Sequence, residues 1–528
     1  MSAATVRHGP ARTPLAAALA AVLAAGSLVA ATSVAGTGRK ALRDDPARRI
    51  FPVLGPAGAG IEPGPAAPAT IVVENCNDDG PGSLRAAVAA AAEGDTIDLV
   101  ALACGTITLA TGAIPVLLDS LTFDGPGAGQ LAIDGGDVDR VLIHPGTGQL
   151  VIRDLTIRHG RDRATGFDLA GGGCIASAGY VTLDHARVTE CYAGGEGAYG
   201  GALYAYSLTM LASTMSANVA YGIHDSAGTA AFGGGAFVYA IDLVDSTVTG
   251  NRAWHRDVPP RTSYDIGGGI ISVRGGFVSG STIDSNTSAQ RGGGIATFGD
   301  LAVSNSTISG NVASLANGGG LLLRNPASLL MFNSTIAYNA AATGGGGALL
   351  SSSGAVMQST LVSGNTSAAG GLQLHSTYAG VVVTGANDLV SGGGGAIELP
   401  PDTLIAPAGL LDLAANGGPT RTQALGPDSP AIDAGNNFAN FTYDQRGAGF
   451  PRVRGAAADI GAYERDGNAA PTPPAPVPAD SPTALAVLGM LLAILGFFRR
   501  HVGARAGLGT PLHPRRRRSP RRGGKDRS

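Results

Sequence analysis

The side chains best suited to bind a ligand are concentrated between residues 161 and 265. Two clusters lie there, His224 with Asp225 and then Trp254 to Asp257, and Trp254 is the only tryptophan of the chain. Aromatic faces stack on sugar rings, while Asp, Arg and His side chains bind hydroxyl or acidic groups. The sequence therefore predicts a glycan-contact edge of seven residues: His224, Asp225, Trp254, His255, Arg256, Asp257 and Tyr264.

The same residue types could also support catalysis, with paired carboxylates or with an Arg or His base. Asp242, Asp245 and Asp284, however, do not share a repeat position well enough to form such a pair. A third interpretation is that these segments are polar only because they are solvated. We assign no catalytic residue and expect no cofactor. Binding without turnover is the preferred hypothesis, and a polysaccharide lyase or glycoside hydrolase using residues 161–265 is the alternative.

A recurring glycine-rich phrase defines the elements that position these residues. Glycine triplets begin at residues 267, 292, 318 and 344 and a glycine pair at 370, so the period is 25 or 26 residues. A fixed period in this range is typical of a solenoid, whose coils are buried by their neighbours. Within each period short apolar runs alternate with Ser, Thr and Asn, which is strand patterning. We predict an all-β chain that folds as a right-handed parallel β-helix with coils of about 25 residues.

An asparagine ends each Ser-Thr strand of the repeat. Stacked on successive coils, these amides could hydrogen-bond along the solenoid axis, as amide ladders do in cross-β structures. Alternatively, Asn is present because it suits a left-handed turn conformation. Both interpretations are structural. The predicted ladder consists of Asn218, Asn251, Asn286, Asn311, Asn339 and Asn365.

The connections that follow the ladder position have two lengths. They are short in late coils, at 287–291, 312–317, 340–343 and 366–369, and longer in four early coils, at 161–170, 192–199, 219–232 and 252–266. Insertions at one repeat position lie on one face of a solenoid, so we expect the long connections to form one edge. The sheet positions carry Ser, Thr, Val and Ala. That composition argues against a catalytic site on a sheet face.

Charge and cysteine content limit the kinds of ligand and the cellular compartment that are compatible with the sequence. The formal net charge is −3, but residues 499–528 carry +10, so the rest of the chain carries −13. An acidic body argues against nucleic acid as a ligand. The four cysteines predict two disulfides, Cys76 with Cys104 and Cys174 with Cys191. The closely spaced cysteine pairs of a zinc site are missing from the sequence, so we expect no metal there.

The N-terminal residues carry export features and a family resemblance. Residues 1–36 have the basic start and apolar run of a signal peptide, with an uncleaved anchor as the alternative, and 37–69 is a Pro-, Gly- and Ala-rich spacer. The motifs in 70–140 are Asn77–Arg85, Gly94–Asp98, Gly105–Leu109 and Leu121–Pro126. This stretch resembles the start of bacterial surface β-helix proteins related to polymorphic outer-membrane proteins. The resemblance implies an N-terminal cap with the first coils at 70–140, ahead of the β-helix at 141–399.

A second resemblance begins where the repeat stops, near Pro400. Its motifs closely resemble the choice-of-anchor module of bacterial surface β-helix proteins, and they are Asn416–Leu425, Ser429–Gly435, Asp444–Gly447 and Asp459–Glu464. The resemblance implies a C-terminal cap module at 400–466, ahead of an anchor. Its charged residues could form a buried network or hold a cation. We expect the network and no metal, because no loop has calcium-hand spacing: Asp433, Asp444, Arg446, Asp459 and Glu464.

The last segments predict attachment to a membrane. A Pro-rich linker at 467–482 precedes an apolar run of sixteen residues at 483–498 and a basic tail at 499–528. This order resembles the C-terminal sorting signals of Gram-negative envelope proteins, although Val477–Ser481 departs from the Ile/Val-Pro-Thr-Leu motif. A permanent anchor is the alternative, and sixteen residues are fewer than the ~20 of a comfortable span.

Together these features predict an exported, monomeric protein at the outer membrane or cell surface or outside the cell. Its C-terminus would hold it to the membrane transiently or permanently. Its expected role is adhesion, envelope structure or contact with a polysaccharide or cell-surface glycan.

Overall fold

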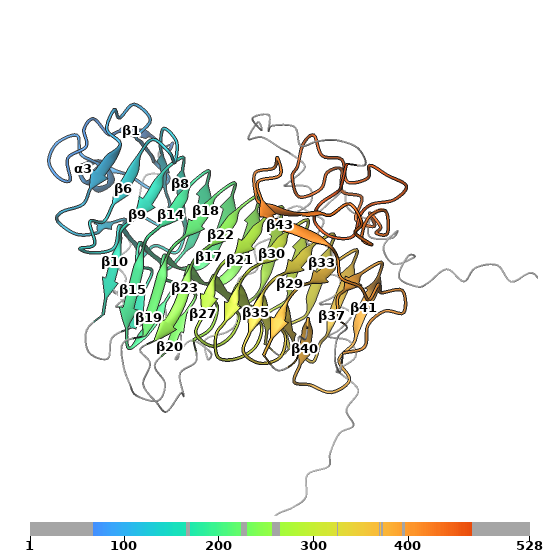
Figure 1. Cartoon of the computed structure of the whole chain (residues 1–528). Helices are drawn as coiled ribbons and strands as arrows, with labels where there is room; N and C mark the ends of the chain where they lie inside the picture. The colour runs from blue at the N-terminus through green and yellow to red at the C-terminus, as the bar shows by residue number, and fades with distance from the viewer. Residues whose placement is uncertain are drawn as a thin grey trace, which may run out of the picture. The chain divides into compact units, whose positions relative to one another are not determined.

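The computed structural model of the chain describes residues 67–164, 169–222, 230–255, 265–324, 326–368, 370, 373–392 and 397–466 (Figure 1). The predicted signal peptide, most of the spacer, the linker, the apolar run at 483–498 and the basic tail lie outside these residues. Within the described ranges no helix has the length and apolarity needed to cross a membrane.

Residues 70–390 form stacked coils, and every strand pairs in parallel with the equivalent strand of the next coil. Three long sheets result, which we call A, B and C, and a fourth, sheet D, is short. Sheet A has 20 strands. They are β1 (Thr70–Val72), β2 (Thr96–Asp98), β4 (Ile114–Pro115), β5 (Leu121–Asp124), β7 (Leu142–His144), β8 (Gln149–Arg153), β12 (Ile175–Ser177), β13 (Tyr180–Asp184), β17 (Leu203–Leu211), β21 (Ala236–Val244), β24 (Ile270–Ser272), β25 (Gly276–Ser279), β28 (Ile295–Thr297), β29 (Leu301–Ser304), β32 (Leu321–Leu323), β33 (Leu329–Phe332), β36 (Ala348–Leu350), β37 (Ala355–Gln358), β40 (Leu374–Ser376) and β41 (Val383–Ala386).

Sheet B has 11 strands of two to three residues each. They are β3 (Thr106–Thr108), β6 (Ala132–Asp134), β9 (Thr156–Arg158), β14 (Arg187–Thr189), β18 (Thr214–Ser216), β22 (Thr247–Thr249), β26 (Thr282–Asp284), β30 (Thr307–Ser309), β34 (Thr335–Ala337), β38 (Leu361–Ser363) and β42 (Leu389–Val390). The middle residue of each complete strand is apolar and fully buried, as Ile107, Ile157 and Ile308 illustrate. Because side chains alternate across a strand, the first and third residues of each face outward.

Sheets C and D are formed by the segments that follow each ladder position, which were predicted to be connections. Sheet C contains β10 (Arg161–Arg163), β15 (Tyr192–Gly195), β19 (Val219–Gly222), β23 (Arg252–His255), β27 (Thr287–Ser288), β31 (Val312–Ala313), β35 (Ala340–Ala341) and β39 (Thr366–Ser367). Sheet D contains β11 (Leu169–Gly171), β16 (Gly197–Tyr199) and β20 (Ala230–Phe232). The long early connections are thus not irregular loops in their described parts, since their backbone groups are paired between coils.

A buried row of asparagine amides runs along the corner between sheets B and C. Asn218 donates its side-chain amide to Asn251 at 2.8 Å, and the pattern continues through the remaining four asparagines at 2.8–2.9 Å. The row ends on Gln373, which accepts from Asn365 at 2.9 Å. The left-handed backbone at this corner belongs to the residue before each ladder position, such as Ala217 or Ser285.

The first coils are closed by a short helix and a disulfide. Helix α3 (Leu84–Ala90) begins at Ser83, whose hydroxyl accepts from the Ala86 N–H at 3.2 Å, and it buries Leu84 and Val88. The disulfide Cys76–Cys104 lies beside it, and Cys174–Cys191 bridges two positions 17 residues apart within one early coil, so both predicted disulfides are confirmed. Disulfides persist mainly in oxidising compartments, in agreement with an exported chain.

Residues 397–466 pack on the side of the solenoid, over the late strands of sheet B (Figure 1). They include the antiparallel pair β43 (Leu410–Ala414) and β44 (Thr422–Leu425). Gln445 accepts from the Thr307 hydroxyl at 2.6 Å, and the Thr282 hydroxyl donates to the Arg421 carbonyl at 2.6 Å. We call residues 400–466 the C-terminal module. It covers strands β26 to β38, a placement that the prediction of a cap did not specify.

Buried ion pairs stabilise the interior of the C-terminal module. Arg446 pairs with Asp444 at 2.6 Å and Arg452 with Glu464 at 3.1 Å, and all four side chains are almost fully buried. Asp459 accepts from the N–H groups of Asp433 at 2.8 Å and Arg465 at 2.6 Å. Burial raises the pKa of Glu464 to about 7, although the Arg452 charge opposes the shift. Within the described residues no group of carboxylates, histidines and cysteines is arranged to hold a metal ion.

Candidate functional site

A row of aromatic rings crosses the outer face of sheet C in three neighbouring coils. The ring centroids of Tyr192 and Tyr221 are 6.4 Å apart, and those of Tyr221 and Trp254 are 5.0 Å apart. The rings are tilted to one another by 35° and 55° and are half-buried. We call these rings, together with Arg161 and Arg252, the aromatic stripe.

Strand register and one glycine explain how the rings meet. Tyr221 and Trp254 occupy one outward column of sheet C, in which β15 contributes Gly194, whereas Tyr192 belongs to the adjacent column. A Cβ atom added to Gly194 would lie 2.5 Å from the Tyr192 ring. The missing side chain therefore lets the Tyr192 ring lie across Gly194, toward Tyr221.

Two arginines flank the rings. The Arg161 guanidinium carbon lies 4.7 Å from the Tyr192 ring centroid, and that of Arg252 lies 4.0 Å from the Trp254 centroid. Contacts of this kind contribute roughly 0.5–1 kcal/mol at exposed sites, so they favour the observed ring orientations. The half-buried rings still expose part of their surface. The stripe presents apolar ring surface beside positive charge, a combination suited to a sugar that carries hydroxyl or acidic groups.

Of the seven residues predicted to contact a glycan, the structure describes two, and they lie on opposite sides of β23. Trp254 is on the outer face, whereas His255 is buried and its Nδ1 bonds to the Asp265 carboxylate. Burial raises the pKa of Asp265, opposed by hydrogen bonds from the Ala231 N–H and His255. His255 is thereby held inside the coil. The other five lie outside the described residues: His224, Asp225, Arg256, Asp257 and Tyr264.

A second row of tyrosines lies along sheet A. The ring centroids of Tyr180 and Tyr206 are 5.3 Å apart, as are those of Tyr206 and Tyr239. Arg274 lies 5.8 Å from the Tyr239 centroid. These residues recur once per coil, so their spacing was already visible in the sequence.

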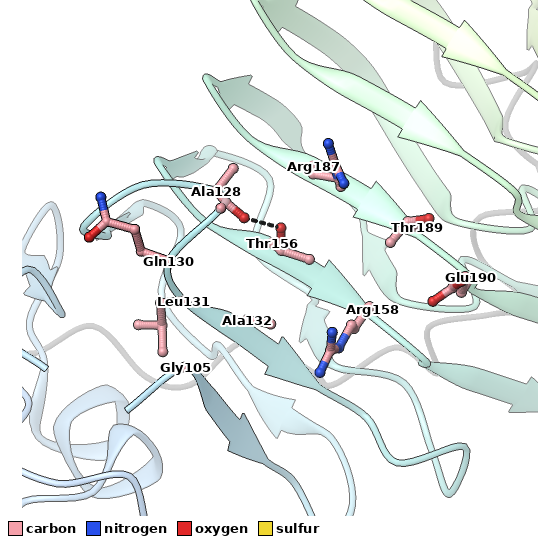
Figure 2. A pocket seen from close by; sticks show the side chains of 11 residues that line it. Gly105, Ala128, Gln130, Leu131, Ala132, Thr156, Arg158, Arg187, Thr189 and Glu190 are labelled. Atoms are coloured by element: carbon pink, nitrogen blue, oxygen red, sulfur yellow. Dashed lines mark hydrogen bonds between the residues drawn. The ribbon is translucent and has the colours of Figure 1, made fainter. Parts of the chain in front are cut away.

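The outer face of sheet B holds a polar pocket of about 330 Å³ over its early strands (Figure 2). One wall is the segment before β6, where the Thr156 hydroxyl donates to the Ala128 carbonyl at 2.6 Å. The other walls are the outward side chains of β9 and β14. Charged and polar groups dominate the lining: Gln130, Thr156, Arg158, Arg187, Thr189 and Glu190.

Beside this pocket, His159 bridges two carboxylates. Its Nδ1 lies 3.0 Å from Asp134 and its Nε2 lies 2.8 Å from Glu190. Burial lowers the pKa of His159, but the hydrogen bonds and charges of the two carboxylates outweigh that effect and raise it. Asp134 also accepts from Arg158 at 2.7 Å. Burial acts to raise the pKa of Asp134, but the Gly136 N–H, His159 and Arg158 lower it overall.

The expectation that sheet positions carry only Ser, Thr, Val and Ala is wrong for these early coils. Asp134, Arg158 and Arg187 occupy outward positions of sheet B, where late coils have mainly Thr or Ser. The available signal was the replacement of the Ser-Thr strand by Thr156–His159 and Arg187–Glu190. The signal was easily missed, because the coils of β9 and β14 lack the Ser-Thr pair that marks the later repeats.

Comparison with known proteins agrees with the coil architecture. Residues 262–399 match a family model described as a right-handed β-helix region. No curated protein matches the sequence. The crystal structure of pectate lyase Pel9A is similar over 76% of this chain and 98% of that chain, with a TM-score of 0.43 and 14% sequence identity. The family match and the parallel registers establish the predicted right-handed parallel β-helix.

Proposed function

We propose that this chain is an exported β-helix protein that contacts a glycan through the outer face of its early coils, without a catalytic step. The observation that carries the proposal is the aromatic stripe on sheet C. Sheet strands are roughly 4.8 Å apart, so one ring per coil creates a row of ring surface along the solenoid axis. A rigid sheet also lowers the entropic cost of binding, because the rings are already positioned.

Attachment to the cell envelope is part of the proposal and rests on the sequence after residue 466. The apolar run at 483–498 would hold the chain in the membrane before or without processing, and the two disulfides agree with export. The β-helix would then serve in adhesion or in contact with surface polysaccharide.

A polysaccharide lyase or glycoside hydrolase on the same edge has less support. Both known mechanisms need titratable groups that converge on a substrate. Asp162 and Asp265 of this edge are buried and face Arg140 and His255 instead. Among the described residues of 161–265, therefore, these carboxylates are engaged away from the outer face of sheet C.

A glycan array probed with the full chain tests the proposal. Trp254→Ala removes the largest ring of the stripe, and Phe298→Ala is the matched control. Phe298 is 38% exposed in a late coil and lies 5.3 Å from Arg324, so it is also an aromatic–arginine pair. We expect glycan binding that weakens about tenfold or more with Trp254→Ala and stays unchanged with Phe298→Ala. Equal binding by all three proteins would contradict the proposal.

A further inference from the structure

The outer face of sheet B is open only over its early strands. The C-terminal module covers it from β26 onward, where the Arg421 guanidinium pairs with Asp284 at 2.5 Å and reaches Thr249 at 3.5 Å. At the other end, residues 128–131 form a wall beside β6 and β9 (Figure 2). The open face is thus bounded at both ends, unlike a continuous groove along the solenoid.

The pocket on this face contains a cation that no carboxylate neutralises. Arg187 is exposed, and within the described parts of the chain no ion pair involves it. Its neighbours in the same outward column are Thr156 on one side and Thr214 on the other. An unpaired guanidinium beside a polar pocket attracts an anion through charge-assisted hydrogen bonds.

The charged residues nearby keep Arg187 available. Glu190 is 55% exposed and long enough to turn toward neighbouring groups, but its carboxylate bonds to His159 Nε2 at 2.8 Å. Arg158 is engaged by Asp134. The Asp134–His159–Glu190 chain therefore holds Glu190 away from Arg187, so His159 acts as a positioning residue.

We propose that this pocket binds the anionic group of a small polyhydroxylated ligand, with Arg187 pairing the anion. The hydroxyl groups of the ligand would bond to Thr189, Thr156 and the Gln130 amide. A volume of about 330 Å³ is at the lower end of ligand pockets, which suits one or two sugar rings rather than a polymer. The site goes beyond glycan contact at the aromatic stripe, because it lies on a different sheet and uses different residues.

Calorimetric titration of the full chain with four matched sugars tests the site. Glucose is the neutral probe, and glucuronate, glucose 6-sulfate and glucose 6-phosphate carry the three candidate anions. We expect at least one anionic sugar to bind and glucose not to bind, and the tightest binder identifies the anion. Equal binding of glucose, or binding of none of the three anions, would overturn the proposal.

Variants separate this site from the stripe and from general effects of charge. Arg187→Ala should weaken the binding of the anionic sugar about tenfold or more, and Arg187→Lys should restore part of it. Arg163→Ala removes an exposed arginine from sheet C and should change nothing. Trp254→Ala should also leave this binding intact, so the two proposals fail independently. His159→Ala should lower the affinity while Glu190→Gln does not, since only the first frees a carboxylate for Arg187. An unchanged affinity in Arg187→Ala would contradict the assignment.

Discussion

The early and late coils of this β-helix share one interior and differ in what they present outward. In sheet C, Arg252 is followed at the same register by Thr287, Val312 and Ala340. In sheet B, early strands present arginine and aspartate, whereas late strands present mainly Thr and Ser. Meanwhile the buried column of Ile, Val and Met continues through both regions.

This contrast shows which positions are free to carry function. Inward positions and the ladder maintain coil stacking, so they vary little along the chain. The residue types at outward positions depend on what covers them. Thr282, Thr307 and Thr335 hydrogen-bond to the C-terminal module, which explains their small polar side chains. Among the described residues, the module's hydrogen bonds reach no residue of the aromatic stripe and extend no further toward the early coils than Thr249, so rings and charges remain available there.

The largest effect is expected when the C-terminal module, which covers the late strands of sheet B, is destabilised. Arg452→Leu leaves the buried Glu464 without its partner, and breaking a buried pair costs about 3–5 kcal/mol. We expect a large loss in the denaturant midpoint of the module, followed by protease cleavage within 400–466.

The matched control is Arg454→Leu. Arg454 pairs with Asp466 near the surface, where an ion pair contributes less than about 1 kcal/mol. Equal loss of stability in both variants would show that the buried pair does not stabilise the module.

A smaller effect is expected at the last coil, where the buried acid Asp388 is 1% exposed. Asp388 accepts from the Thr360 N–H at 2.8 Å, and burial raises its pKa to about 8. Because the folded state holds the proton more tightly, the stability that this proton supplies is complete below about pH 4 and is lost as pH rises toward 8. Asp388→Asn should therefore melt at a higher temperature than the wild type at pH 8.

Melting curves at several pH values check this prediction. At pH 4 the variant and the wild type should melt alike, and the exposed Asp412→Asn control should keep the wild-type pH profile. A variant that is less stable than the wild type at pH 8 would contradict the assignment to Asp388.

The smallest effect is expected in the early coils, at the glycine beneath the Tyr192 ring of the aromatic stripe. Gly194→Ala places a methyl group where the Tyr192 ring lies, so the ring must move. The ring can turn toward solvent, and we expect a stability change below about 1 kcal/mol together with a several-fold weaker glycan affinity. Tyr192→Phe keeps the ring and should preserve the affinity. A Gly194→Ala protein that binds as tightly as the wild type would mean that the position of this ring is immaterial.

The late coils were predictable because their period is regular. Successive ladder asparagines are 25, 28 and 26 residues apart from Asn286 onward, so glycines, strands and ladder positions recur in step along the sequence. In the early coils the spacing is 33 and 35 residues, and the extra residues form sheet D or lie outside the described ranges. The regular late coils were therefore sufficient to predict the fold.

The sites were less predictable, because they depend on register between coils. Trp254 was identifiable as a single conspicuous residue, but its meeting with Tyr221 and the role of Gly194 require the pairing of β15, β19 and β23. The burial of His255 depends on Asp265, ten residues away in sequence. Packing of the C-terminal module on sheet B joins residues about 140 positions apart, which no local pattern reveals.

Trp254 itself offers the most direct test of the central claim, because it is the only tryptophan of the chain. Its fluorescence reports on the outer face of sheet C alone. We predict that titration with the best glycan from the array changes the emission of Trp254, and that the change saturates at the concentration at which binding saturates. Glycan binding that leaves the emission unchanged would place the ligand elsewhere and contradict the account.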